Sequence, residues 1–143
     1  MSDGLYKIFI LGSPIINSCI NFKSIVDAIY SNNLNTSFLK KIDGEFLIII
    51  IKDEIVTIIN DRFSSIPLYY FTENNKLNIS ISMFSLFEQL KNKNLYTEKF
   101  MEFLYFQRLH GYSTYSKKIR ILPASTRLEL KAAFGLIEKY SFK

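Results

Sequence analysis

Runs of β-branched and aromatic residues predict strands in the first half of the chain. Residues 6–11 read Tyr-Lys-Ile-Phe-Ile-Leu and meet Gly12-Ser13-Pro14, which predicts a strand that ends in a turn. Residues 45–52 predict a strand whose six central positions, 46–51, are all apolar, as in a strand that is buried on both faces at the centre of a sheet. The tight Asp53-Glu54 connection to residues 55–59 predicts that these two strands form a hairpin.

Further strands are predicted later in the chain. A second hairpin is expected between residues 68–71 and 77–82, because the return strand alternates apolar and polar residues. Two short strands, 126–131 and 136–140, are expected to close the chain and to be joined at Phe134-Gly135. We therefore expect antiparallel pairing between neighbours along the sequence.

Helical periodicity occupies the remaining segments. Residues 22–30 place apolar side chains at helical spacing before Asn32-Asn33, and residues 36–41 predict a shorter helical turn. Helices are also expected at 83–91 and 97–109, the second with Thr97 as N-cap and an apolar face that packs on the core. Strands, then helices, then strands again predict one α+β domain over residues 1–143, an antiparallel sheet with helices packed against it.

Composition narrows the classes of function. The longest apolar run, Phe46 to Ile51, is far shorter than the ~20 residues of a membrane span. Residues 1–5 lack a basic region and a cleavage site, so we expect no secretory signal and a cytoplasmic protein. One cysteine, Cys19, and one histidine, His110, predict neither a disulfide nor a metal site, and we expect no cofactor.

The formal charge of +5 raises the possibility of an anionic partner. The lysines are scattered, with short pairs such as Lys40-Lys41 and Lys117-Lys118, and they form no stripe along a helix. Nucleic-acid binding is therefore disfavoured, because it depends on a continuous basic surface.

Several short motifs follow one another in a recognisable order. They are Ile42-Asp43-Gly44-Glu45-Phe46, Asp61-Arg62-Phe63, Pro67-Leu68-Tyr69-Tyr70, Ile81 to Leu86, His110 to Thr114, Ile119 to Pro123 and Glu138-Lys139-Tyr140. In this order and spacing, from about residue 40 to the end, they resemble the glutaminase domain of the asparagine synthetase family, a class II glutamine amidotransferase domain.

That resemblance implies a fold and a chemistry. The fold would be the αββα sandwich of N-terminal nucleophile hydrolases, two antiparallel sheets packed face to face and covered by helices, here incomplete. Family members release ammonia from glutamine and deliver it to a domain that activates a carboxylate with ATP. The structural motif would comprise Asp43, Gly44, Phe46, Asp61, Arg62, Pro67, Tyr69 and Tyr70, with Asp61 and Arg62 joined as a bidentate pair.

The sequence departs from the family where chemistry is expected. The family's N-terminal cysteine has no counterpart, and the chain resembles a domain truncated at the front; Cys19 is interpreted as a small buried residue. Gly12 is a weak match to the oxyanion-hole glycine, but Leu11 replaces the neighbouring amide. Phe22 stands where the family has the aspartate that binds the substrate ammonium, and no S-G-G-x-D-S loop for ATP is present.

We therefore assign no catalytic residue and predict a degenerate amidotransferase-like domain that packs against a separate ATP-dependent, amide-forming synthetase. An alternative is an amidohydrolase that uses Ser2 as an N-terminal nucleophile. A second alternative is a basic module for an anionic partner. His110 could titrate in a pocket, although a lone histidine in a loop more often faces solvent.

Overall fold

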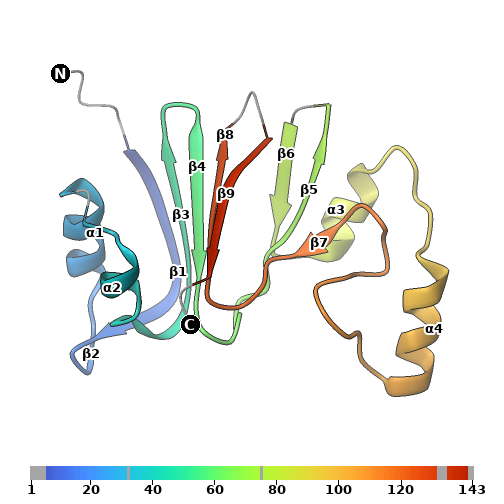
Figure 1. Ribbon diagram of the computed structural model, residues 1–143, viewed down its shortest axis with the longest axis horizontal. Coiled ribbons are helices and arrows are strands. Elements are labelled where there is room, and N and C mark those ends of the chain that lie inside the picture. The colour runs from blue at the N-terminus through green and yellow to red at the C-terminus, as the bar shows by residue number, and fades with distance from the viewer. Residues whose placement is uncertain (1–5, 32, 75, 132–134, 142–143) are drawn as a thin grey trace. The chain divides into compact units, whose positions relative to one another are not determined.

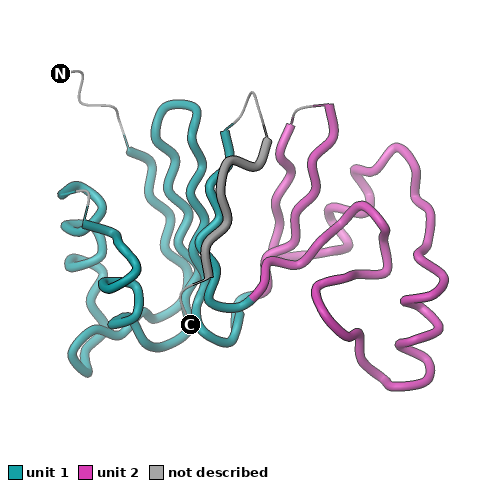
Figure 2. Tube along the Cα trace, viewed as in Figure 1, with its two compact units in different colours: residues 1–66, 124–143 teal, residues 67–123 magenta. Residues whose placement is uncertain are grey.

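The computed structural model describes residues 6–31, 33–74, 76–131 and 135–141. The chain is divided into two compact units. The first unit comprises residues 1–66 and 124–143, and the second comprises residues 67–123 (Figure 2). The chain therefore enters the second unit once and returns to the first.

The first unit is built on a six-stranded sheet in which every pair of neighbours is antiparallel. The strand order is β2-β1-β3-β4-β8-β9 (Figure 1). The bounds are β1 Tyr6–Ile16, β2 Cys19–Ile20, β3 Asp43–Lys52, β4 Ile55–Asn60, β8 Thr126–Lys131 and β9 Gly135–Ser141. The predicted hairpin is confirmed, because β3 pairs with β4 from Leu47↔Asn60 to Lys52↔Ile55.

Two helices cover one face of this sheet, α1 (Phe22–Tyr30) and α2 (Thr36–Leu39) (Figure 1). The helix α1 begins where predicted because the Asn21 side chain accepts a hydrogen bond from the Ser24 N–H at 2.9 Å. The apolar stripe of α1 packs against the strands in one core cluster. Its buried members are Ile16, Ile25, Ala28, Ile29, Leu34, Leu39, Ile42, Phe46, Ile48, Ile50 and Ile59.

The central position of β3 is also confirmed. This strand pairs with β1 on one side and β4 on the other, and its consecutive residues Phe46, Leu47 and Ile48 are all buried. Since successive side chains of a strand point to opposite faces, both faces of β3 are covered at this level. The uninterrupted apolar run of the sequence reflects this double burial.

The predicted end of β1 at Gly12 is wrong, because the strand continues through Gly12-Ser13-Pro14 to Ile16. Gly12 pairs with Phe46 in the register and has a φ of 86°. A Cβ at this position would lie 2.2 Å from the Glu45 carbonyl oxygen. The glycine thus permits two backbones to approach closely within a continuous ladder, where the sequence suggested a turn.

The second unit contains a three-stranded antiparallel sheet of order β6-β5-β7 and two helices. The bounds are β5 Tyr69–Glu73, β6 Lys76–Ser80, β7 Arg120–Ile121, α3 Met83–Gln89 and α4 Thr97–Phe106. A small core joins sheet and helix through Phe71, Leu86, Leu90 and Ile119. The second predicted hairpin is confirmed by the β5–β6 pairing.

The helix α4 differs from the prediction in three respects. Tyr96 occupies the N-cap position, not Thr97, and its side chain makes no capping hydrogen bond. The helix ends at Phe106 because Gln107 is left-handed, with φ 55°, and its N–H returns to the Phe103 carbonyl at 2.7 Å. None of the residues of α4 is buried, so the expected packing helix leaves most of its apolar side chains exposed.

The predicted α+β class with antiparallel sheets and helices is confirmed. The short strands β2 and β7 were not predicted, because two residues carry too little pattern to be recognised. Phe134 of the predicted closing turn lies outside the described residues, and Gly135 belongs to β9. Among the helices of the described residues, none combines the length and hydropathy of a membrane span. The single-domain organisation and the face-to-face packing of sheets stay predictions.

We predict that Gly12→Ala destabilises the chain far more than Gly111→Ala. Both glycines have positive φ, but nothing lies within 4 Å of a Cβ added at Gly111. Gly111→Ala should cost about 1 kcal/mol for the backbone conformation alone, and Gly12→Ala about 3 kcal/mol or more because the Glu45 carbonyl must also move. Urea unfolding of both variants measures the difference. Equal losses would contradict the steric explanation.

Candidate functional site

Asp61, which follows β4 and is fully buried, is the centre of a hydrogen-bond network in the first unit. Its carboxylate accepts hydrogen bonds from the backbone N–H groups of Phe46 at 3.3 Å, Phe63 at 2.7 Å and Ser65 at 3.1 Å. The Ser65 hydroxyl donates to the same carboxylate at 3.2 Å. Four donors therefore satisfy a charged group that would be costly to bury alone.

The backbone of Asp61 extends this network to two other segments. Its N–H donates to the Phe46 carbonyl at 3.1 Å, and its carbonyl accepts from the Ser125 N–H at 2.9 Å. Asp61 consequently ties the start of β3, its own loop and the segment before β8 to one point. A carboxylate with its acceptor positions occupied by the protein is suited to a structural role and offers little to a substrate.

Arg62 takes a different partner from the one expected. Its guanidinium donates to the Lys40 carbonyl at 2.9 Å, so it holds the end of α2 near the loop after β4. The Asp61 carboxylate accepts hydrogen bonds from backbone amides and a hydroxyl, not from the Arg62 guanidinium. The bidentate Arg–carboxylate pair suggested by the sequence is thus wrong, because Asp61 points into the interior while Arg62 is exposed.

Asn60 completes the buried polar cluster and was missed by sequence reasoning. It is fully buried, its side-chain oxygen accepts from the Thr126 N–H at 2.8 Å, and its amide donates to the Ser64 hydroxyl at 3.2 Å. The signal was present: Asn60 and Asp61 come directly after residues 55–59, the strand predicted from the sequence, and polar residues enter the interior only with partners. Ser125 gave no comparable signal.

The remaining motif residues lie at two places. Asp43 is exposed at the start of β3, where its side chain accepts from the Gly44 N–H at 2.9 Å. Gly44 has φ 85°, and a Cβ there would lie 2.4 Å from the Ser13 carbonyl oxygen, so it mirrors Gly12 across the ladder. Pro67, Tyr69 and Tyr70 belong to the second unit.

The tyrosines of β5 are packing residues in this unit. Tyr69 packs against the core cluster around Phe71. Burial raises the pKa of the Tyr70 hydroxyl, and the positive charge of Arg120 opposes that shift. Partial burial within a paired strand leaves these rings poorly placed for stacking on a nucleic-acid base.

The positions at which chemistry was sought lie on β1, β2 and α1 of the first unit. Leu11 and Gly12 lie within β1, paired with Leu47 and Phe46. Phe22 is the first residue of α1 and is 46% exposed. Cys19 is exposed in β2, so its interpretation as a buried residue is wrong; a two-residue strand at the sheet edge supplies no layer to cover it.

The described residues contain no cluster of three or more His, Cys, Asp or Glu side chains that could hold a metal ion. Ser2, the candidate nucleophile of the alternative interpretation, lies outside the described residues.

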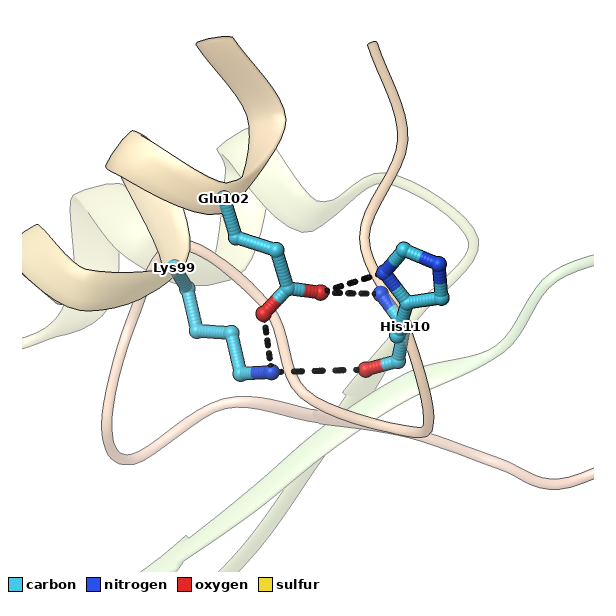
Figure 3. Close-up of polar contacts among 3 residues, drawn as sticks. All are labelled: Lys99, Glu102 and His110. Carbon is cyan, nitrogen blue, oxygen red and sulfur yellow. Dashed lines mark hydrogen bonds and ion pairs between the residues drawn. The ribbon is translucent and has the colours of Figure 1, made fainter. Parts of the chain in front are cut away.

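One titratable cluster lies in the second unit, formed by Lys99, Glu102 and His110 (Figure 3). Glu102 accepts from the Lys99 ammonium at 2.5 Å through one oxygen. Its other oxygen accepts from the His110 backbone N–H at 2.5 Å and lies 2.9 Å from Nδ1 of the same residue. The cluster fastens the loop after α4 back onto the helix.

These contacts hold the pKa of the Glu102 carboxyl at about 2, below its ordinary value of 4.5, mainly through the hydrogen bond from Lys99 and then that from the His110 backbone. The His110 side chain is half exposed, as expected for a loop histidine, and its ring packs edge-on against Phe106. The described contacts place no hydroxyl or thiol nucleophile beside the imidazole. The arrangement therefore acts as a clamp on the loop.

We predict that the clamp makes stability depend on pH in the acid range. Because the pKa of Glu102 is lower in the folded chain, its contribution is complete above pH 4.5 and is lost as the pH falls towards 2. Glu102→Gln should lower stability at neutral pH and flatten this acid dependence, whereas Glu98→Gln on the same helix should change little. Urea unfolding at a series of pH values measures both effects, and an unchanged profile in Glu102→Gln would contradict the assignment.

Comparison with known proteins identifies a family for the chain. A family model described as a glutamine amidotransferase domain matches residues 24–141. No curated protein matches the chain. The matched range contains β3, β4 and the Asp61 loop, and it spans both units. Since it covers most of the sequence, the chain belongs to the glutamine amidotransferase domain family.

Proposed function

We propose that this chain is a glutamine amidotransferase domain of the asparagine synthetase type that has lost glutaminase activity. In this proposal it serves, in the cytoplasm, as a structural or partner-binding subunit of an ATP-dependent synthetase that forms amide bonds. The observation that carries the proposal is the contrast between an intact scaffold and substituted site positions. The two halves of that contrast rest on different residues.

The scaffold half rests on the polar network of Asp61. The motif residues Phe46 and Asp61 are joined by hydrogen bonds in the interior, and Gly44 permits a close approach to the Ser13 carbonyl. Loss of any member of this network would lower the stability of the fold, because each lost partner would leave a buried polar group without a hydrogen bond. Its completeness supports a chain that still folds as its family does.

The chemical half rests on Leu11 and Phe22, at the positions where the resemblance calls for an oxyanion-binding amide and an ammonium-binding carboxylate. A leucine side chain donates no hydrogen bond to a developing negative charge. A phenylalanine ring offers no negative charge to pair with a substrate ammonium. Phe22 is the first residue of α1 and is exposed, and the first turn of this helix contains no acidic residue that could take the place of the aspartate. Both substitutions remove binding energy for glutamine and its transition state.

In this proposal, the role of the domain is to bind a partner, the ATP-dependent synthetase. A domain that no longer produces ammonia can still act by stabilising or positioning the synthetase with which its relatives cooperate. This is a separate step from the loss of chemistry, and it is tested separately below.

We predict that the purified full chain releases no ammonia from glutamine above the background of buffer. Cys19→Ser and Ser2→Ala should leave this result unchanged, since neither residue is assigned a catalytic role. A coupled glutamate dehydrogenase assay for ammonia measures the rate. Turnover abolished by Cys19→Ser would defeat the proposal, and turnover abolished by Ser2→Ala would favour the alternative of an N-terminal serine nucleophile.

A further inference from the structure

An open groove lies between α3 and α4 of the second unit, with a volume of about 280 Å³ and an apolar lining. Phe84 and Phe87 of α3 face Phe100 and Phe103 of α4 across it. Tyr115 also lines the groove, and its ring makes edge-on contacts with Phe103 at 5.6 Å and Phe100 at 6.5 Å between centroids. Aromatic side chains on two helices form the walls that receive an apolar helix face in helix-in-groove recognition.

The apolar surface extends beyond the groove. Phe84 is 69% exposed at one wall, and Leu104, which follows Phe100 by one turn of α4, is 50% exposed. No residue of α4 is buried, although the helix is rich in aromatic residues. Scattered exposed apolar residues are ordinary, but a contiguous set around a groove is typical of a protein interaction site.

The positive charge of the chain is concentrated in the unit that carries this groove. Residues 67–123 contain eight Lys or Arg residues and four Asp or Glu residues, whereas the whole chain has a net charge of +5. Two of those four acids, Glu73 and Glu102, are already paired with Lys118 and Lys99. The unit therefore presents an excess of cations to an approaching partner.

Two of these cations lie close to the groove along the chain. Lys91 and Lys93 are exposed in the connection that leads from α3 to the groove residue Leu95. The segment through which the chain reaches the apolar groove is therefore basic.

We propose that this groove binds an amphipathic helix of a partner protein, with apolar residues on one face and acidic residues at its flanks. Apolar side chains at i, i+3, i+4 and i+7 would enter between the phenylalanines, and Asp or Glu side chains would meet the lysines of the segment that leads to the groove. The inference rests on the proposed function, because it locates the surface through which the partner synthetase would be held.

Charge complementarity decides between this occupant and a second copy of the chain. Two copies that met through the groove would bring the same lysines together, and like charges at an interface are unfavourable. An acidic partner gains from the same residues. The chain should accordingly be monomeric in sedimentation experiments at moderate ionic strength.

The experiment uses the full chain and two designed peptides of roughly 15 residues. Both carry the same leucine face; one has glutamate at the flanking positions and the other has lysine. Fluorescence anisotropy of the labelled peptides should show saturable binding of the glutamate peptide and binding at least about tenfold weaker for the lysine peptide. No saturable binding, or equal binding of the two peptides, would overturn the proposal.

Two matched pairs of variants test the location. Phe84→Ala should weaken binding of the glutamate peptide about tenfold, whereas Phe63→Ala, at an 82% exposed position in the first unit, should not. Lys93→Glu should weaken it and Lys23→Glu on α1 should not. Equal effects within either pair, or a dimer dissociated by Phe84→Ala, would overturn the assignment. Glutamine turnover would defeat the proposed function alone, and failed peptide binding would defeat this surface alone.

Discussion

A buried carboxylate organises the first unit of this protein. Asp61 collects hydrogen bonds from the amides of Phe46, Phe63 and Ser65, and its own backbone joins Phe46 to Ser125. Segments that are far apart in the sequence are thereby held at one point, at the end of β4. The long central strand and the return of the chain at residue 124 both depend on this point, since a buried charge without these donors would be strongly destabilising. Asn60 reinforces it through Thr126 and Ser64.

This constraint involves two of the motifs that carry the family resemblance, those around Phe46 and Asp61. The close contacts between β1 and β3 add a second constraint, because Gly12 and Gly44 each face a carbonyl oxygen. Leu11 and Phe22 take no part in the hydrogen bonds of Asp61. Their proposed substitution can therefore proceed while the scaffold persists. The interaction surface proposed on the second unit shares no residue with that network.

Much of the fold could be predicted from local pattern, because β3, α1 and the two hairpins each carry a clear period or a tight turn. The errors arose where tertiary contacts override such patterns. Gly12-Ser13-Pro14 has the composition of a turn, yet ten register pairs with β3 carry the strand through it. The apolar sequence of α4 predicts a buried face, but the helix is exposed, and periodicity cannot distinguish a core face from a surface for a partner. The clamp on Glu102 depends on a loop conformation that no spacing rule foresees.

The central claim is the proposal that this chain keeps the fold of its family but no longer binds glutamine. The most direct measurement is a two-dimensional amide NMR spectrum of the full chain, labelled with nitrogen-15, recorded during a titration with glutamine. The account predicts a well-dispersed spectrum, including shifted amides for the donors to Asp61, in which no resonance moves on addition of glutamine. Saturable shifts confined to residues around Gly12 and Phe22 would contradict it.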